Sequence, residues 1–235
     1  MASPIEQFQV KPVLPFDVTF TNSAFAMAVA VGAAYLLFSR GMRDPGMIPS
    51  RIQSVCEMIY EFVRGIIDEN VGREGRPYLP VVFTLFLFIL FGNLLGMVPG
   101  FFTFTSHIIV TFTMAVVVVG SVTLIGIARH GTHFFSLFAP AGAPKFIYPI
   151  LVPIEIISYL IRPISLSVRL AVNMTAGHIM LKSFAGFTVA MGVFGILPLV
   201  AAVGLTGLEI VIAILQAYVF TVLSCLYLND AINLH

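Results

Sequence analysis

The feature that most limits what this chain can fold into is a series of long apolar stretches with almost no charge. Residues 107–128 contain no Asp, Glu, Lys or Arg, and residues 78–98 are interrupted only by Thr84 and Asn93. A helix needs about 20 predominantly apolar residues to cross a membrane. Charged residues make up 10% of this chain, against roughly a quarter in soluble proteins. The sequence therefore predicts an all-α integral membrane protein.

About five membrane-embedded helices are expected, in a single membrane domain over residues 1–235. The predicted spans are, in order, residues 20–38, 78–98, 107–128, 146–181 and 187–228. At 1.5 Å per residue the last two would be about 54 and 63 Å long, which indicates strongly tilted helices. The final stretch could instead hold two spans joined near residues 204–207. One bent helix is favoured, because those residues contain neither a charge nor a strong turn dipeptide.

Residues 51–70 show a different pattern, since their apolar side chains recur at steps of three and four. One helical face is formed by Ile52, Val55, Ile59, Phe62 and Ile66. Charged side chains occupy the rest of the helix. An amphipathic helix between spans most simply lies along the membrane surface. Packing against a partner subunit is the alternative, and periodicity does not distinguish the two.

Positive charges are unevenly divided between the predicted loops. Residues 40–76 carry six arginines, and the next loop on the same side adds Arg129 and Lys145. The opposite side has only Lys11 and Lys182. Because Lys and Arg collect in cytoplasmic loops, we expect the N-terminus outside and, with five spans, the C-terminus inside.

Net charge and cysteine content exclude several kinds of partner. The net charge of +1 provides no basic surface for nucleic acid. Cys56 and Cys225 are far apart and lack metal-ligand spacing, so neither a metal nor another cofactor is expected.

Several ionisable and amide side chains remain inside the predicted helices once the loops are assigned. Glu155, Arg162 and Arg169 are seven residues apart, so they follow one stripe of a helix. Glu209 and Gln216 have the same spacing in the last helix. Such residues mark ion pathways by default, because exposing them to lipid is unfavourable. The alternative is that they pair with each other and only hold two helices together.

The sequence around this stripe is similar to that of a known family. Residues 165–178 read SLSVRLAVNMTAGH, and EIISYLIRP precedes them at 155–163. The last helix carries QAYVFT at 216–221, and FGNLLGMVP occurs at 91–99. These motifs closely resemble subunit a of F-type ATP synthases over essentially the whole chain, and most resemble its mitochondrial and alphaproteobacterial branch.

The resemblance implies a static proton-channel subunit, not itself an enzyme, beside a rotating ring of c subunits. The two long C-terminal helices would form an antiparallel pair facing that ring, and peripheral-stalk subunits b or b′ would be further partners. Arg169 would be the essential arginine, with Gln216 near it, while His178 and Glu209 would form an acid–histidine pair. The membrane would be a bacterial inner membrane, or alternatively the mitochondrial inner membrane.

Two half-channels that do not meet are then expected. The residues assigned to proton translocation are Arg169, Glu155, Asn173, His178, Glu209, Gln216, Ser165 and Asn93. His178, Glu209 and Asn93 are assigned to the outer side. The residues assigned to the inner side are Glu155, Ser158, Tyr159 and Ser165.

Arg169 is expected to separate the two sides, because a guanidinium does not release its proton in a protein. Its charge would also favour proton release from each arriving ring carboxylate. Arg162 is expected to be structural, paired with Glu155 or with lipid headgroups.

Three other classes of protein fit the sequence less well. A stand-alone secondary ion transporter would need inverted repeats with broken helices in both halves, and the polar stripe is confined to the C-terminal part. No protease or hydrolase motif occurs, which argues against an intramembrane enzyme. A structural anchor would not need Arg169 opposite Glu209 and Gln216.

Overall fold

In the part of the chain that the structure describes, the fold is all-α apart from one antiparallel pair of short strands near the N-terminus. The structure is a computed structural model, and it describes residues 12–14, 17–43, 49–98, 101–131, 133–134 and 146–233. Lys11 and Lys145, which contributed to the expected sidedness, lie outside these residues. The elements are β1 (Pro12–Leu14), β2 (Asp17–Thr21), α1 (Asn22–Gly41), α2 (Arg51–Asn70), η2 (Arg73–Tyr78), α3 (Leu79–Gly96), η3 (Phe104–Ser106), α4 (Ile108–His130), α5 (Tyr148–Ala190), η5 (Gly192–Gly195) and α6 (Ile196–Ile232).

Five of the described helical segments are long and apolar enough to cross a membrane, as the sequence predicts. They are α1, the segment formed by η2 and α3, α4, α5 and α6. The helices α1, α3 and α4 begin and end within three residues of the predicted spans. The remaining long helix, α2, spans the same residues as the predicted amphipathic helix. Ser50 caps its N-terminus, where the Ser50 hydroxyl accepts a hydrogen bond from the Gln53 backbone N–H.

The turn between the two long helices lies later in the chain than the sequence suggested. The predicted turn falls at residues 182–186, but α5 continues to Ala190 and η5 makes the turn. Lys182, expected near a helix end, therefore lies about two turns inside α5. A single lysine does not end an apolar helix. Gly192 has a φ of 57°, a left-handed conformation that ends a helix. As favoured from the sequence, α6 is continuous across residues 204–207.

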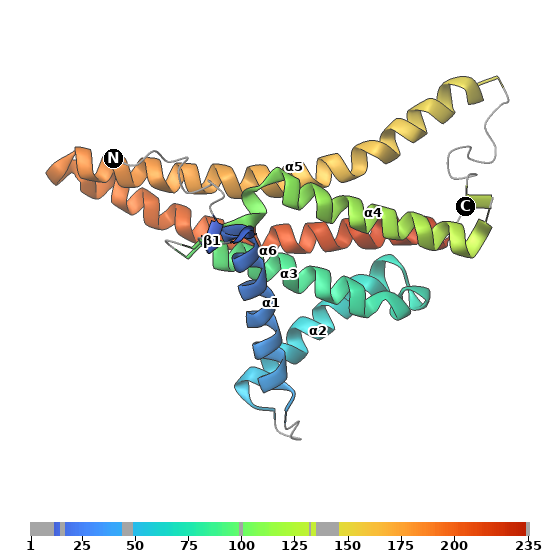
Figure 1. The fold of residues 1–235 in the computed structure, drawn as a ribbon, viewed down its shortest axis with the longest axis horizontal. Helices are drawn as coiled ribbons and strands as arrows, with labels where there is room; N and C mark the ends of the chain where they lie inside the picture. The colour runs from blue at the N-terminus through green and yellow to red at the C-terminus, as the bar shows by residue number, and fades with distance from the viewer. Residues whose placement is uncertain are drawn as a thin grey trace.

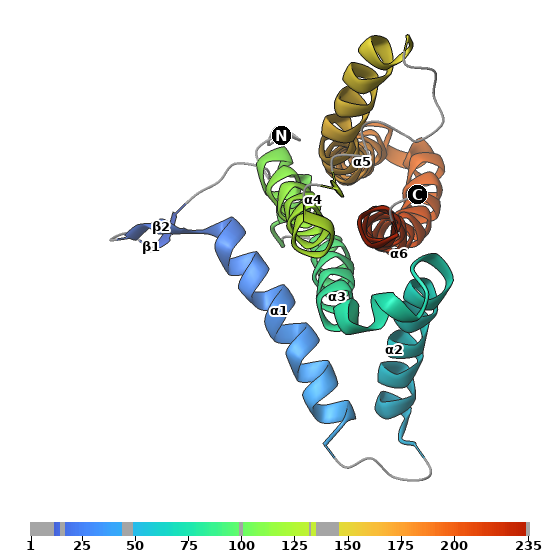
Figure 2. The same ribbon diagram turned by 90° about the vertical axis from the view of Figure 1, so that its right-hand side faces the viewer.

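The two long helices, α5 and α6, run side by side in opposite directions along the longest axis of the molecule (Figure 1). α3 and α4 pack beside the C-terminal half of α6, and the α5–α6 hairpin extends beyond them (Figure 1). α1 and α2 form a V on one side of the other four helices (Figure 2). The first part of α5 diverges from α4 (Figure 1), and it contains Pro153 and Pro163, which remove backbone hydrogen bonds and bend helices.

The main buried core joins α2, α3, α4, α5 and α6. Ile89 of α3, Leu166 and Leu170 of α5, and Ala217 and Phe220 of α6 are at most 1% exposed. These side chains are aliphatic or aromatic, and the polar side chains of Ser167, Gln216 and Thr221 are buried on the same two long helices. This packing fixes the position of α5 and α6 against the other helices.

One side of α2, which includes Ile66 from the predicted apolar face, packs on the protein. Cys56 and Val63 are fully buried, and the Cys56 thiol donates to the Leu37 carbonyl of α1 at 3.6 Å. By contrast, Ile52, Val55 and Phe62 remain 45% to 47% exposed. α2 therefore has one side packed on the protein and a second apolar side left uncovered, which leaves both the membrane and a partner as its possible contact.

The segment after α3 folds back onto that helix because two glycines make room for it. A Cβ at Gly92 would overlap the ring of Phe104, and a Cβ at Gly96 would overlap the side chain of Thr103. From the other side, the Thr175 hydroxyl of α5 donates to the Ser106 carbonyl at 3.3 Å. The segment is thereby held between α3 and α5.

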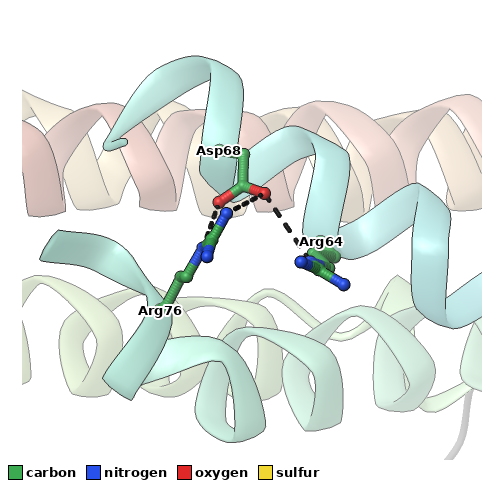
Figure 3. Close-up of polar contacts among 3 residues, drawn as sticks. All are labelled: Arg64, Asp68 and Arg76. Carbon is green, nitrogen blue, oxygen red and sulfur yellow. Dashed lines mark hydrogen bonds and ion pairs between the residues drawn. The ribbon is translucent and has the colours of Figure 1, made fainter. Parts of the chain in front are cut away.

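Asp68 ties the end of α2 to the turn that follows it (Figure 3). Its carboxylate accepts hydrogen bonds from Arg76 at 2.9 and 3.2 Å and lies 3.7 Å from the Arg64 Nε. The hydrogen bond from Arg76 lowers the pKa of Asp68 from its usual value. Arg129, at the end of α4, pairs with Glu74 of η2. The end of the positively charged segment 40–76 and the end of α4 therefore meet at this ion pair.

We expect the contact between α2 and η2 to weaken in acid. Because folding lowers the pKa of Asp68, its contribution is complete above its ordinary pKa of 3.8 and is lost as the pH falls through the lower, folded-state value. Asp68→Asn should remove this pH dependence and reduce the amide-exchange protection of residues 71–76 a few-fold at neutral pH, as for an exposed ion pair. Glu69→Gln, at an exposed neighbouring position, is the control, and equal loss of protection in acid by both variants would contradict the assignment.

Candidate functional site

The two long helices are joined in their middle by a contact between two amides. Asn173 of α5 donates from Nδ2 to Oε1 of Gln216 on α6 at 3.0 Å. Gln216 is 1% exposed, and its Nε2 finds no hydrogen-bond partner among the described residues. An orphaned buried donor favours a further polar group or water beside it. This contact fixes the axial register of α5 against α6, which the sequence alone did not determine.

Arg169 lies one turn before Asn173 on α5 and is exposed in the isolated chain. We find no hydrogen bond or ion pair between its guanidinium and a described residue. Ser165, Val168 and Val172 are also exposed along this part of α5. An arginine facing lipid near the centre of a membrane costs about 2.5–3.5 kcal/mol or more. The exposed face of α5 therefore favours a polar or charged neighbour, which the described residues do not provide.

A cavity of about 170 Å³ opens between α5 and α6 on the side of Asn173 away from the start of α5. It is large enough for several water molecules. Its polar lining consists of Asn173, His178 and Glu209, and apolar side chains such as Met97 complete it. Two of these residues, His178 and Glu209, are the predicted acid–histidine pair, so the fold brings both to one cavity.

Glu209 is the buried acid of this cavity. Its Oε1 is buried and has no hydrogen-bond partner among the described residues. A Cβ at Gly177 would overlap that oxygen, so the glycine allows the carboxyl group to approach α5. A buried carboxyl oxygen beside space for water is a group that can exchange a proton.

His178 is held by a residue that the sequence analysis did not identify. Its Nε2 lies 3.0 Å from the Thr103 hydroxyl, which itself donates to the Gly96 carbonyl at 3.0 Å. Thr103 is 6% exposed. Nothing in the periodicity marks Thr103, because it lies in an irregular segment between two spans and meets α5 only through the tertiary fold.

Asn93, assigned to the outer side from the sequence, does not line this cavity. It is fully buried between α3 and α6, where its Nδ2 donates to the Ala213 carbonyl at 3.2 Å. Its Oδ1 has no partner among the described residues, so a role in proton transfer stays a prediction, while the contact to α6 is structural.

Arg162 pairs with Asp230 at 3.0 Å, and not with Glu155 as expected. Its guanidinium also lies over the rings of Tyr159 and Tyr227, at 5.2 and 5.0 Å from their centres. These contacts join α5 to the C-terminal end of α6. The sequence pattern suggested the wrong acid because it compares positions on one helix, whereas the partner comes from the other.

The remaining residues of the predicted inner side are less enclosed. Glu155 is half-buried, and Ser158 and Ser165 are exposed. The Tyr159 hydroxyl lies 2.5 Å from the Thr123 hydroxyl of α4. Within the described residues, no group of three or more His, Cys, Asp or Glu side chains could hold a metal ion.

Comparisons with known proteins all identify the same family. The family described as ATP synthase A chain matches residues 22–229. The chain is 54% identical to ATP synthase subunit a of Rhodospirillum rubrum and 51% identical to that of Paramagnetospirillum magneticum, in both cases over all of both chains. It is 50% identical to ATP synthase subunit a of Agrobacterium fabrum, over 98% of this chain and 97% of that protein.

These relatives span the full length of the chain, including the amphipathic helix and both long helices that form the polar contact. With five membrane-capable helices and a family match over 22–229, the chain belongs to the ATP synthase subunit a family.

Proposed function

We propose that this chain is the static proton-translocating subunit of a rotary F-type ATP synthase, and that it is not itself an enzyme. It would supply two offset half-channels to a neighbouring ring of c subunits. The observation that carries this proposal is the position of Arg169, exposed between two separate groups of polar side chains on the same pair of helices. The family membership supports the complex in which it works.

The outer half-channel is the cavity lined by Asn173, His178 and Glu209. On α5, His178 follows Arg169 by nine residues, which is about 13 Å along the axis. An imidazole titrates near neutral pH and can pass a proton to or from a carboxylate. Protons would enter this cavity from outside and reach a ring carboxylate near Asn173 and Gln216.

The inner half-channel begins on the other side of Arg169. Glu155 precedes Arg169 by fourteen residues, about 21 Å along α5. The Arg162–Asp230 pair lies between these positions and holds the two helices together at that end. Protons released from the ring would pass along the half-buried Glu155 and the exposed Ser165 to the inside.

Four apolar side chains support a barrier to a direct path between these two sides. Leu166, Leu170, Ala217 and Phe220 are at most 1% exposed and lie in the core beside the buried amide of Gln216. The remaining route passes the exposed face at Arg169, whose permanent charge repels a proton. A proton must therefore bind a ring carboxylate, move with the ring and leave on the other side.

The partners and orientation follow from this arrangement. The c-ring would cover the exposed face of α5, where its carboxylates would provide the neighbour that Arg169 needs. Peripheral-stalk subunits b or b′ would hold the chain static. The membrane would be a bacterial inner membrane, with the N-terminus outside and the C-terminus inside, because Lys and Arg collect in the predicted loops of one side.

Reconstitution tests this function against a stand-alone ion transporter. Vesicles that contain this chain alone should show no proton flux above that of empty vesicles when a membrane potential is imposed. Vesicles that contain the chain with its c-ring and stalk subunits should conduct protons. Proton or sodium flux through the chain alone would instead support the transporter.

A further inference from the structure

We propose that Thr103 is a positioning residue that holds neutral His178 as the Nε2–H tautomer, so that Nδ1 is the ring nitrogen that takes up a proton. The assignment of the tautomer depends on the hydrogen bonds around Thr103. Its consequence for proton flux rests on the proposed function, in which His178 belongs to the outer half-channel.

The Thr103 hydroxyl contacts two groups but has a single proton to donate. Its oxygen lies 3.0 Å from the Gly96 carbonyl and 3.0 Å from the His178 Nε2. A carbonyl oxygen can only accept a hydrogen bond, so the hydroxyl proton is used toward Gly96. The hydroxyl oxygen must then accept from His178, which requires the proton of the neutral imidazole to be on Nε2.

The Gly96 carbonyl depends on the Thr103 hydroxyl as its hydrogen-bond donor. Gly96 is the last residue of α3, and carbonyls in the last turn of a helix have no donor within the helix. Thr103 is buried, and leaving a buried carbonyl unpaired costs about 1–3 kcal/mol. Releasing the hydroxyl proton toward His178 would therefore leave the Gly96 carbonyl without a donor among the described residues.

The position of Thr103 is fixed from several directions. Gly96 has no side chain where Thr103 approaches, and Gly92 accommodates the neighbouring Phe104. Thr175 of α5 binds the Ser106 carbonyl at the end of the same segment. The segment therefore presents the Thr103 oxygen to His178 as a fixed acceptor, as a supporting carboxylate or carbonyl does for other functional histidines.

This arrangement determines where the proton binds and leaves. With Nε2 already protonated, an incoming proton binds the Nδ1 lone pair, and the same N–H bond breaks when the proton moves on. The Nε2–H bond persists throughout, so the ring keeps its orientation. Among the described residues, the charged and titratable groups near the ring include Lys182 on α5 and Glu209 on α6, while residues 101–106 contain none.

The tautomer can be read directly by ¹⁵N NMR of the assembled complex in membranes, with labelled histidine. The chain has five histidines, and a difference spectrum against His178→Gln identifies the relevant signal. We expect the Nε2–H signature for the neutral ring in the unmodified protein. An Nδ1–H signature there would overturn the inference without any Thr103 variant.

Two substitutions of Thr103 separate the hydrogen bond from simple packing. Thr103→Val keeps the shape but removes the hydroxyl, and should shift the tautomer and lower proton flux about tenfold, in line with the loss of other positioning partners. Thr103→Ser keeps the hydroxyl but removes the methyl group that lies closest to Gly96, and should retain both the tautomer and the flux. A packing role would give the reverse order.

Thr105→Val is the matched control, because the Thr105 hydroxyl is buried in the same segment without a hydrogen-bond partner among the described residues. It should leave the His178 signal and the flux unchanged. An unchanged tautomer in Thr103→Val would overturn the inference. A shifted tautomer with normal flux would instead support the assignment and contradict the role of His178 in proton uptake.

Discussion

Replacing Arg169 with alanine is expected to slow ATP-driven proton pumping by the assembled complex in membrane vesicles at least tenfold. An opposite charge within about 4–6 Å lowers the pKa of a carboxyl group by about 1–3 units. Removing the guanidinium would therefore slow proton release from a ring carboxylate by about 10- to 1,000-fold. A pH-sensitive dye in the vesicle lumen measures the rate.

The same substitution should raise the passive leak of protons. Arg169 is exposed on α5 between the cavity and the polar residues of the proposed inner side, and in the proposed function its charge is the barrier on this face. Without that charge, water and protons could pass from one side to the other along the ring interface. Arg169→Lys should show an intermediate result, because an ammonium keeps the charge but can lose its proton when buried.

Arg162→Gln is the control for removing a positive charge from the same helix. Its partner Asp230 and the rings of Tyr159 and Tyr227 hold Arg162 in a structural contact. We expect less assembled complex in this variant but no increase in leak for each complex that forms. Intact pumping by Arg169→Ala, at normal amounts of the complex, would contradict the proposed function of Arg169.

Glu209→Gln is expected to lower proton flux by about 100-fold without increasing the leak. The buried Oε1 of Glu209 lines the outer cavity and has no partner among the described residues, so the carboxyl group is placed to exchange a proton with water. Glutamine preserves its size but cannot carry that proton. Loss of a group that transfers protons typically costs a factor of 10² to 10⁴.

His178→Gln should have a similar effect, and the double variant should be little worse than either single one. Residues that act in one step are not additive when removed together. Glu61→Gln makes the same chemical change on the exposed side of α2 and should leave flux unchanged. Co-purification with the c-ring shows that assembly is retained. Normal flux in both single variants would remove these residues from the proton path.

The helical architecture was predictable because it depends on local composition. Long uncharged stretches predict the membrane-capable helices wherever they occur, and steps of three and four predict an amphipathic helix at the residues that form α2. The exact ends depend on weaker signals. The apolar run before Lys182 predicted that the helix ends there, but the backbone hydrogen bonds of α5 continue to Ala190.

The candidate site was only partly predictable, because its contacts join different helices. The stripe of Glu155, Arg162 and Arg169 follows from spacing on one helix. The partners of these residues depend on how far α6 is displaced along α5, which periodicity does not contain. In the structure Arg162 forms an ion pair with Asp230, and Asn173 forms a hydrogen bond with Gln216.

The sequence by itself determined that this chain is a helical membrane protein of the ATP synthase subunit a family, because apolar run lengths and motif residues are properties of the linear chain. Only the tertiary structure decided that Thr103 binds His178, that Asn93 contacts the α6 backbone outside the outer cavity, and that Arg169 is left without a partner among the described residues. Those outcomes depend on the packing of α3, α5 and α6, in which distances between residues distant in sequence are set by side-chain volume and glycine contacts.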